Sequence, residues 1–339
     1  MKQALQKTFN GIISKIKLSF YNLSVKIHNK KPKFLKKRKG SVNGRNAKFF
    51  YAAVLFFPLL QFLIFYVFVN INSILLSLQR YDMTTGKFVF MGLGNFKAFL
   101  HDLFNDSIII KATYNSITLY LVGLLIGLPL NIIFSYFLYK QIPLNGFFRV
   151  VLFLPQIISS MVISLMFKFF VERGLPSILE IIGITNAHNL ITRADTAFKT
   201  IIFYCIWSGF GTQIIIYSSA MSRVPQSLIE AGKLDGLTAF KEFWHIILPL
   251  IFPTITTFLV VGVAGLFTAQ AGLYDFFGPQ APYHTYTYGY FLFVKVIGEA
   301  NIVNYPYASA AGIIFTMIAA PLTLLAKYLL EKFGPTVEY

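Results

Sequence analysis

The sequence predicts an all-α protein that crosses a membrane six times, and three observations support this fold class. Hydrophobic residues make up 56% of the 339 residues and charged residues only 13%, with a mean hydropathy of +0.63. Soluble domains contain about 25% charged residues, so this composition does not suit a water-soluble surface. The apolar residues also form six separate blocks, and basic residues are unevenly distributed between the segments that join them.

Each apolar block is long enough to form a transmembrane helix. About 20 residues, rising about 1.5 Å each, span the roughly 30 Å hydrocarbon core of a bilayer. Several blocks contain proline, which costs a soluble helix about 3 kcal/mol but is tolerated in packed transmembrane helices. The blocks make up a predicted six-helix domain over residues 49–332. They cover residues 49–70, 117–139, 150–170, 200–220, 250–270 and 308–330.

The distribution of Lys and Arg predicts the orientation of these helices. With the N-terminus placed inside, the cytoplasmic segments contain 21 of the 30 basic residues and the exterior segments contain 9. Lys and Arg accumulate on the cytoplasmic side of membranes, so both termini are expected there. The net charge of +17 is then a topology signal. Nucleic-acid binding is disfavoured, because no soluble domain combines a basic stripe with exposed aromatic residues.

Residues 1–48 form a basic N-terminal extension with fourteen Lys and Arg and no acidic residue. Part of this extension has apolar residues at three- and four-residue spacings, which predicts an amphipathic helix lying on the inner leaflet. The basic cluster that follows would bind anionic membrane lipid. The alternative is a disordered basic tail that only enforces topology. The apolar residues are Phe9, Ile12, Ile13, Ile16, Phe20, Leu23 and Ile27.

No enzyme, metal or cofactor site is expected in this chain. The single cysteine, Cys205, lies within the fourth apolar block, and the five histidines are scattered without an HExxH pair. The sequence contains no GxxxxGK[ST] phosphate loop and no GxSxG motif. The three large exterior connections, residues 71–116, 171–199 and 271–307, are too short for an independent catalytic domain.

A polar segment between the fourth and fifth blocks, residues 230–236, has the features of a short surface helix. Pro225 is suited to the first turn of a helix over residues 226–235, and Gly236 stands where a helix ends in a left-handed residue. Ala231 and Gly232 would then give a surface with almost no side chain, open to close approach. Glu230 offers a carboxylate to a basic residue of a partner. The plain alternative is a solvated connection.

The spacing of this segment resembles the coupling-loop signature of the membrane subunits of binding-protein-dependent ABC importers. Glu230-Ala231-Gly232 is followed by three residues, Gly236, nine residues and Ile246-Ile247-Leu248-Pro249. That family usually has Ala at the position of Gly232, a change that would loosen the helix by up to about 1 kcal/mol. Phe277-Gly278-Pro279 also departs from the usual Gly-Gly-Pro.

Further stretches are similar to the carbohydrate branch of that family, which includes permeases for maltose, multiple sugars and glycerol phosphate. They extend the resemblance over most of residues 49–332, and the basic extension lies outside it. The stretches are Gly92-Leu93-Gly94-Asn95-Phe96, Phe148-Arg149 with Phe153-Leu154-Pro155, Ile206-Trp207-Ser208-Gly209, and Tyr307-Ala308-Ser309-Ala310.

The resemblance implies the type I ABC importer permease fold in a bacterial cell membrane. This chain would pair with a second permease subunit, two cytoplasmic ATPase subunits that bind ATP and Mg²⁺, and an extracellular solute-binding protein. Residues 222–249 would be the cytoplasmic coupling loop, and residues 333–339 a cytoplasmic tail. The residues implied to contact the ATPase are Glu230, Ala231, Gly232, Asp235 and Gly236.

The resemblance also directs the search for a solute path to the fourth and fifth helices. Sugar sites stack a ring on an aromatic face and pair hydroxyls with amides and hydroxyls. Each candidate could equally be a packing or interhelical hydrogen-bonding residue. The candidates are Trp207, Gly209, Thr212, Gln213, Thr268 and Gln270.

Two other classes of transporter compete with this interpretation. A permease for another solute, such as a peptide or a phosphorylated polyol, would share the coupling signature. A secondary transporter would need ionisable residues on an ion path within the membrane. The six blocks contain few ionisable residues beyond Lys168, which lies near the outer edge. A secondary transporter would also leave the coupling signature without a role.

Overall fold

A computed structural model of the chain describes residues 44–183, 189–298 and 301–335. The amphipathic helix and basic cluster predicted within residues 1–43 lie outside these ranges, as do residues 336–339 of the tail. The chain divides into two parts, residues 1–68 and 69–339, and each is described by itself.

The described portion of the first part is an apolar helix. α2 (Gly44–Gln61) leads into a π-helical segment, η2 (Phe62–Phe68), and Pro58 lies inside α2. All of residues 49–68 except Val67 are exposed. A helix that is apolar on every side suits contact with lipid or with other membrane helices. The apolar stretch Phe49–Ser77 continues in the second part as α3 (Val69–Ser77).

Five helical stretches in the described ranges are long and apolar enough to cross a membrane. The shortest has 25 residues, about 37 Å of α-helix. Besides Phe49–Ser77, they are Ser107–Tyr139, Ala197–Met221, Ala239–Gly265 and Ile302–Phe333. Their elements are α5 (Ser107–Val122), η3 (Gly123–Gly127) and α6 (Leu128–Tyr139); α10 (Ala197–Met221); α12 (Ala239–Glu242), η5 (Phe243–Ile247) and α13 (Leu248–Gly265); and η8 (Ile302–Asn304) and α16 (Tyr305–Phe333).

The third predicted span is broken rather than straight. α7 (Asn145–Ile157) and the helical stretch Ser160–Ile181 meet at an angle of 106°. That stretch consists of α8 (Ser160–Phe169), η4 (Phe170–Gly174) and α9 (Leu175–Ile181). Ile158 and Ser159 have extended ψ angles of 142° and 138°, which interrupt the helix. The predicted six spans are therefore present when this bent pair is counted as one.

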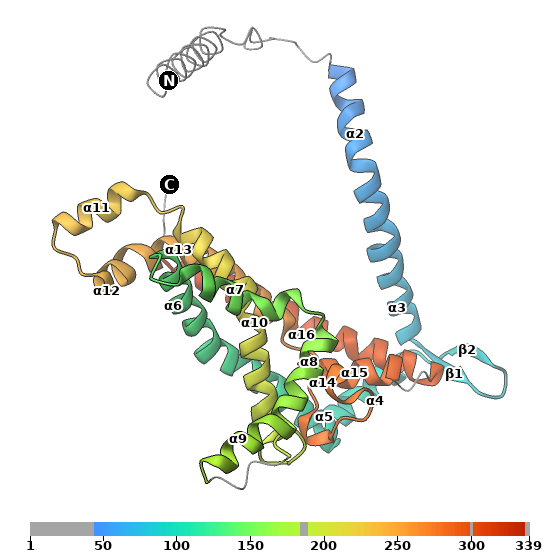
Figure 1. The fold of residues 1–339 in the computed structure, drawn as a ribbon. Coiled ribbons are helices and arrows are strands. Elements are labelled where there is room, and N and C mark those ends of the chain that lie inside the picture. The colour runs from blue at the N-terminus through green and yellow to red at the C-terminus, as the bar shows by residue number, and fades with distance from the viewer. Residues whose placement is uncertain (1–43, 184–188, 299–300, 336–339) are drawn as a thin grey trace, which may run out of the picture. The chain divides into compact units, whose positions relative to one another are not determined.

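Smaller elements gather at the end of the second part opposite α11 (Gln226–Leu234) (Figure 1). β1 (Gln79–Asp82) and β2 (Lys87–Phe90) form an antiparallel hairpin that the all-α prediction does not include. The amide of Asn95 donates hydrogen bonds to Ser77 O and Gln79 O, at 2.8 and 2.6 Å. The other elements there are α4 (Gly94–Asn105), α14 (Leu273–Phe277), η6 (Tyr283–Thr285), α15 (Tyr288–Phe293) and η7 (Val294–Gly298).

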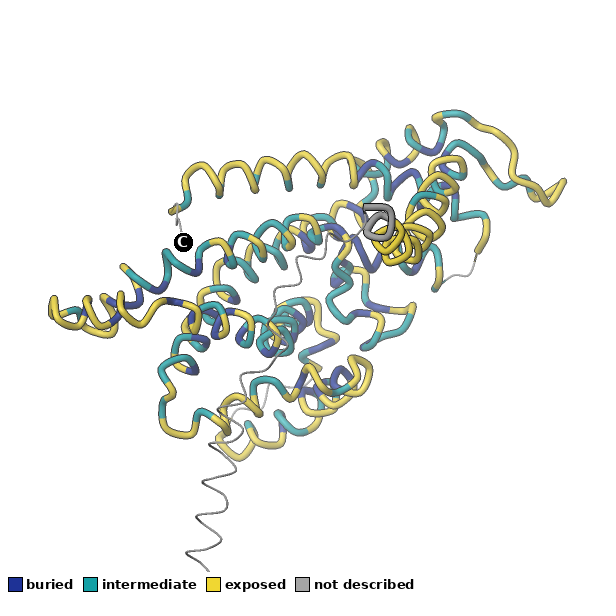
Figure 2. Tube along the Cα trace, turned by 90° about the horizontal axis from the view of Figure 1, so that it is seen from above, coloured by how far each residue is buried: buried dark blue, intermediate teal, exposed yellow. Residues whose placement is uncertain are grey.

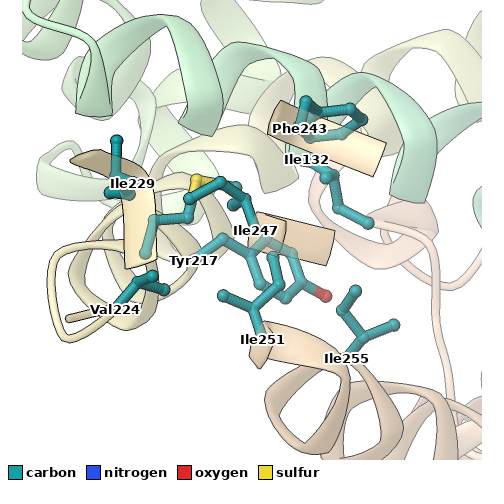
Figure 3. Packing of buried hydrophobic residues seen from close by; sticks show 9 residues of the cluster. Ile132, Tyr217, Val224, Ile229, Phe243, Ile247, Ile251 and Ile255 are labelled. Carbon is teal, nitrogen blue, oxygen red and sulfur yellow. The ribbon is translucent and has the colours of Figure 1, made fainter. Parts of the chain in front are cut away.

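A buried apolar cluster joins the membrane helices to the loop between α10 and α13. Figure 3 shows Tyr217 of α10 beside Ile251 and Ile255 of α13, with Ile229 of α11 in the same cluster. Its buried members are Ile132, Tyr217, Met221, Val224, Ile229, Phe243, Ile247, Ile251 and Ile255. The rest of α11 is mostly exposed, as Figure 2 shows for the loop at the end of the helices. Through Ile229, α11 therefore shares one buried cluster with residues of α6, α10 and α13.

Candidate functional site

The polar segment forms the short helix that its residues predict. α11 begins after Pro225 and ends at Leu234, and Gly236 adopts the left-handed φ of +76°. Beyond the helix end, the Leu237 amide donates to Gly232 O at 2.9 Å, and the Gly236 amide donates to Lys233 O at 3.1 Å. This pair of bonds is a Schellman motif, which satisfies the last carbonyls of a helix and requires the left-handed residue.

The exposure of α11 separates the five residues implied to contact an ATPase. Glu230, Ala231, Asp235 and Gly236 are exposed, whereas Gly232 is buried. A Cβ at Gly232 would lie 2.8 Å from Leu237 Cδ1 and 2.9 Å from Ile246 Cδ1. The expectation that Gly232 lies on the open surface beside Ala231 is therefore wrong, because Leu237 and Ile246 cover it. Contact between the other four residues and an ATPase stays a prediction.

The second half of the loop is attached to the cytoplasmic end of α6, as the predicted orientation defines that end. Lys140 Nζ forms a 2.5 Å ion pair with Glu242 Oε1, and Glu242 has only 4% of its side chain exposed. The Tyr136 hydroxyl donates to Ala239 O at 2.9 Å, and the Tyr136 ring lies 4.9 Å from that of Phe243. Sequence reasoning missed these contacts, since Lys140 and Glu242 are 102 residues apart. The local sequence offers one indication that Glu242 is buried: it lies between Phe240 and Phe243.

Two glycines of α10 face different surroundings. A Cβ at Gly209 would meet nothing within 4 Å, and its place on the solute path stays a prediction. A Cβ at Gly211 would lie 2.7 Å from Gln156 Cγ and 3.1 Å from the backbone oxygen of Leu152. Gly211 therefore allows α7 and α10 to cross closely, whereas Gly209 is not required for packing between helices.

Thr212 lies beside the break between α7 and α8. Its hydroxyl donates to Gln156 Oε1 at 3.2 Å, and Gln156 Nε2 donates to the Ser208 carbonyl. Ser159 and Ser160, at the break itself, are exposed. Non-helical backbone at membrane depth is tolerated where protein or a water-filled cavity surrounds it. Gln156 is a candidate path residue that sequence reasoning missed; the nearby Pro155, inside an apolar block, was the available signal.

Gln213 faces a cavity of about 190 Å³ between the second, fourth and fifth spans. Asn131 Nδ2 donates to Gln213 Oε1 at 2.7 Å. Asn131 Oδ1 and the Tyr217 hydroxyl are buried without a hydrogen-bond partner among the described residues. Such groups are usually satisfied by water or a ligand. The cavity is lined by Tyr120, Gly123, Leu124, Leu128, Gln213, Tyr217, Phe258, Leu259 and Gly262.

The other candidate path residues lie elsewhere. Trp207 stacks on Phe167 with ring centroids 5.9 Å apart and packs near Tyr204. Thr268 and Gln270 follow α13, which ends at Gly265, so they are not on the fifth helix as expected. The turn that contains them lies beside the N-terminal half of α10, where Trp207 also lies, because Cys205 Sγ is 3.7 Å from Ala271 O. Gly209, Thr212 and Gln213 thus lie within about one turn of α10, but only Gln213 lines the cavity, and Thr212 bonds Gln156 instead. Thr268 and Gln270 lie beyond the end of α13 and do not line this cavity.

Lys168 has a packing role in this structure. Its Nζ donates to Phe276 O at 3.1 Å and lies 5.4 Å from the centroid of the Phe277 ring. The ammonium group therefore caps the end of α14 rather than starting a chain of ionisable residues. Within residues 44–183, 189–298 and 301–335, no group of three His, Cys, Asp or Glu side chains is placed to hold a metal ion.

These features define a class: a multi-pass α-helical membrane protein in which a largely apolar cavity containing one amide, that of Gln213, lies between the spans and a short surface helix is attached to their ends. The chain belongs to the family of binding-protein-dependent transport system inner membrane components, whose profile matches residues 121–339. It is therefore a permease subunit of an inner-membrane transport system.

Curated relatives cover most of the chain. The multiple sugar-binding transport system permease protein MsmF of Streptococcus mutans is 26% identical, over 81% of this chain and 93% of MsmF. The arabinooligosaccharides transport system permease protein AraP of Bacillus subtilis is 25% identical, over 81% and 86%. The sn-glycerol-3-phosphate transport system permease protein UgpA of Pectobacterium atrosepticum is 23% identical, over 81% and 91%.

Two solved structures share the fold. One is a bacterial ABC transporter involved in the import of the acidic polysaccharide alginate, with a TM-score of 0.72 and 21% identity over 85% of this chain and 96% of that one. The other is a bacterial alginate ABC transporter in complex with an alginate pentasaccharide-bound periplasmic protein. Its TM-score is also 0.72, with 22% identity over 86% and 97%. The chain therefore has the fold of an ABC importer permease.

Proposed function

We propose that this chain is one of two permease subunits of an ATP-driven importer for a neutral sugar or oligosaccharide. It forms half of the translocation path, and its coupling loop, residues 222–249, binds one of two cytoplasmic ATPase subunits. The observation that carries the proposal is the coupling loop: α11 presents Glu230 and Ala231 outward, while Ile229 on its other face joins a buried cluster that contains residues of three spans. A helix held in this way can transmit the movement of a soluble partner to the membrane helices.

The energy source lies in separate subunits under this proposal. The sequence has no phosphate-binding loop, so ATP and Mg²⁺ would be bound by the ATPase subunits and not by this chain. An extracellular solute-binding protein would deliver the sugar, a role supported by the structural neighbour that was solved with its periplasmic protein. A second permease subunit would complete the path, with membrane lipid around both.

The lining of the cavity supports a neutral solute. Tyr120, Tyr217 and Gln213 supply aromatic faces, a hydroxyl and an amide, which match the apolar faces and hydroxyl groups of a sugar ring. No lining residue of this cavity carries a charge. A phosphorylated polyol would need basic groups to offset its charge. The names of MsmF and AraP favour the same solute class.

A permease for a phosphorylated polyol remains the second candidate, because UgpA is also similar over 81% of the chain. The experiment that separates the two is ATP-dependent uptake into liposomes containing the complete complex and its binding protein. Labelled neutral oligosaccharides and labelled glycerol phosphate are offered separately. We expect uptake of a neutral oligosaccharide that stops when ATP is withheld. Uptake of glycerol phosphate alone would replace the sugar assignment, and ATP-independent uptake would contradict the importer assignment.

A further inference from the structure

The coupling loop has two halves, and they are attached to the membrane helices in different ways. α11 is held by apolar packing, through Ile229 in the buried cluster and through Leu237 and Ile246 over Gly232. α12 is held by polar groups at the end of α6, where Lys140 and Glu242 form their ion pair. The two attachments act on one loop, because Ile246 follows α12 and covers α11.

The Lys140–Glu242 contact is a largely buried ion pair. Glu242 is only 4% exposed, so its carboxylate depends on the Lys140 ammonium, which is 27% exposed, for compensation of its charge. Lys140 also lies over the rings of Tyr136 and Tyr139, at 5.6 and 5.8 Å from their centroids. A cation placed over aromatic faces and paired with a buried carboxylate has few alternative positions.

A second contact fixes the same short helix. The Tyr136 hydroxyl donates to the carbonyl of Ala239, the first residue of α12, while Glu242 is its last. Both ends of α12 are therefore attached to the end of α6, through Tyr136 within the helix and Lys140 directly after it. Two points of attachment favour movement of α12 together with α6.

We propose that Lys140 and Glu242 are positioning residues that fix the coupling loop to the end of α6, so that movement of α11 reaches α6 directly. This inference rests on the proposed function, and it adds the route by which the loop acts on the second span. α6 also contributes Leu128 to the lining of the cavity beside Gln213. The route therefore leads from the loop to the helix that borders the candidate solute site.

The test is a double-mutant cycle on the complete complex in liposomes, with sugar transported per ATP hydrolysed as the readout. The single variants are Lys140→Met and Glu242→Gln, and the exchanged pair is Lys140→Glu with Glu242→Lys. The matched control is Lys327→Met, which removes a lysine from the exposed ion pair with Glu331 on α16, where both side chains are more than half exposed.

We expect each single variant to lower the transport ratio by on the order of 5-fold or more, with the ATPase still co-purifying. The exchanged pair should recover most of the ratio, and Lys327→Met should leave it unchanged. If the two residues had only a structural role, the variants would lower the melting temperature of the complex. The complexes that still assemble would then transport the normal amount of sugar per ATP hydrolysed. Wild-type ratios in both single variants would overturn the proposal.

A milder variant covers the case in which neither single variant assembles. Tyr136→Phe removes only the hydroxyl that donates to Ala239 and keeps the ring beneath Lys140. It should lower the ratio by less than the single variants at unchanged abundance, and a wild-type ratio would overturn the proposal. Glu230→Lys is measured alongside: if it too transports normally, the coupling role itself fails. If only the Lys140 and Glu242 variants transport normally, the positioning role alone fails.

Discussion

The Leu237 amide donates a hydrogen bond to the Gly232 carbonyl, and the Leu237 side chain covers the Gly232 Cα. This relationship explains why a small residue suits position 232. An added methyl group would lie 2.8 Å from Leu237 Cδ1, inside van der Waals contact. The small residue therefore serves packing within the loop, and its neighbour Ala231 is the small residue that faces outward.

A matched pair of substitutions tests this difference. Gly232→Leu should destabilise the loop by about 1–3 kcal/mol through overpacking, whereas Ala231→Leu should leave stability nearly unchanged. Gly232→Ala should stay within about 1 kcal/mol of the original, because the gain in helix propensity offsets the close contact with two flexible side chains. Melting of the purified chain measures stability, and co-purification measures ATPase binding. Equal melting temperatures for the two leucine variants would refute the assignment of faces.

The crossing of α7 and α10 gives a second matched pair. Gly211→Ala should destabilise the protein by about 1–3 kcal/mol, because the backbone oxygen of Leu152, 3.1 Å from the new Cβ, cannot rotate away. Gly209→Ala meets open space and should keep stability while changing solute uptake. Melting and uptake are measured on both variants. The account of α10 fails if Gly209→Ala is the more destabilising change.

The unpartnered hydroxyl of Tyr217 predicts a separation of stability from transport. Removing it in Tyr217→Phe deletes a buried group with no partner among the described residues, so stability should be unchanged or higher. Uptake should fall, because Tyr217 lines the cavity beside Gln213. Gln213→Leu should lower uptake by about 10-fold, since an unpaired solute hydroxyl costs about 1–3 kcal/mol. A large loss of stability in Tyr217→Phe would show that the hydroxyl is bonded within the fold.

The β1–β2 hairpin should be sensitive to acid through Asp82. Hydrogen bonds from the Thr84 hydroxyl and amide and the Thr85 hydroxyl lower the pKa of Asp82 from 3.8 to about 2. Because the folded pKa is depressed, the stabilisation is present above about pH 4 and is lost as the pH falls through 2. The rate of hydrogen exchange at the Thr84 amide, corrected for the intrinsic rate at each pH, should therefore rise as the pH is lowered from about 4 to 2. In Asp82→Ala, which removes the acceptor oxygens, this exchange should already be fast at neutral pH, and slow exchange in that variant would argue against a role for the carboxylate.

Local chemistry predicted much of this fold, and contacts between distant residues account for the rest. Hydropathy located the spans, and Pro225 and Gly236 located α11 to within a residue. The fifth apolar block was predicted to run to residue 270, whereas α13 ends at Gly265. Hydropathy could not locate this end, because the residues that follow are also largely apolar. The hairpin had a usable signal in Thr84-Thr85-Gly86, with Gly86 at a φ of +64°.

The candidate site was less predictable, because its partners come from different helices. Thr212 was a candidate by its residue type, but its partner Gln156 is 56 residues away. Gln213 likewise bonds Asn131, 82 residues earlier in the chain. Which face of α11 is covered depends on Leu237 and Ile246, whose positions follow from tertiary packing rather than from the spacing of the signature.

The central claim is that the outward face of α11 couples an ATPase to transport, and Glu230→Lys tests it most directly. Uptake per ATP is measured in liposomes containing the complete complex, with Glu331→Gln as an exposed acidic control on α16. Reversing the charge of an interface carboxylate should weaken ATPase binding by at least about 2 kcal/mol, or about 30-fold. We predict normal membrane insertion, weak ATPase co-purification and loss of coupled uptake. Full uptake with a normal transport ratio in Glu230→Lys would contradict the account.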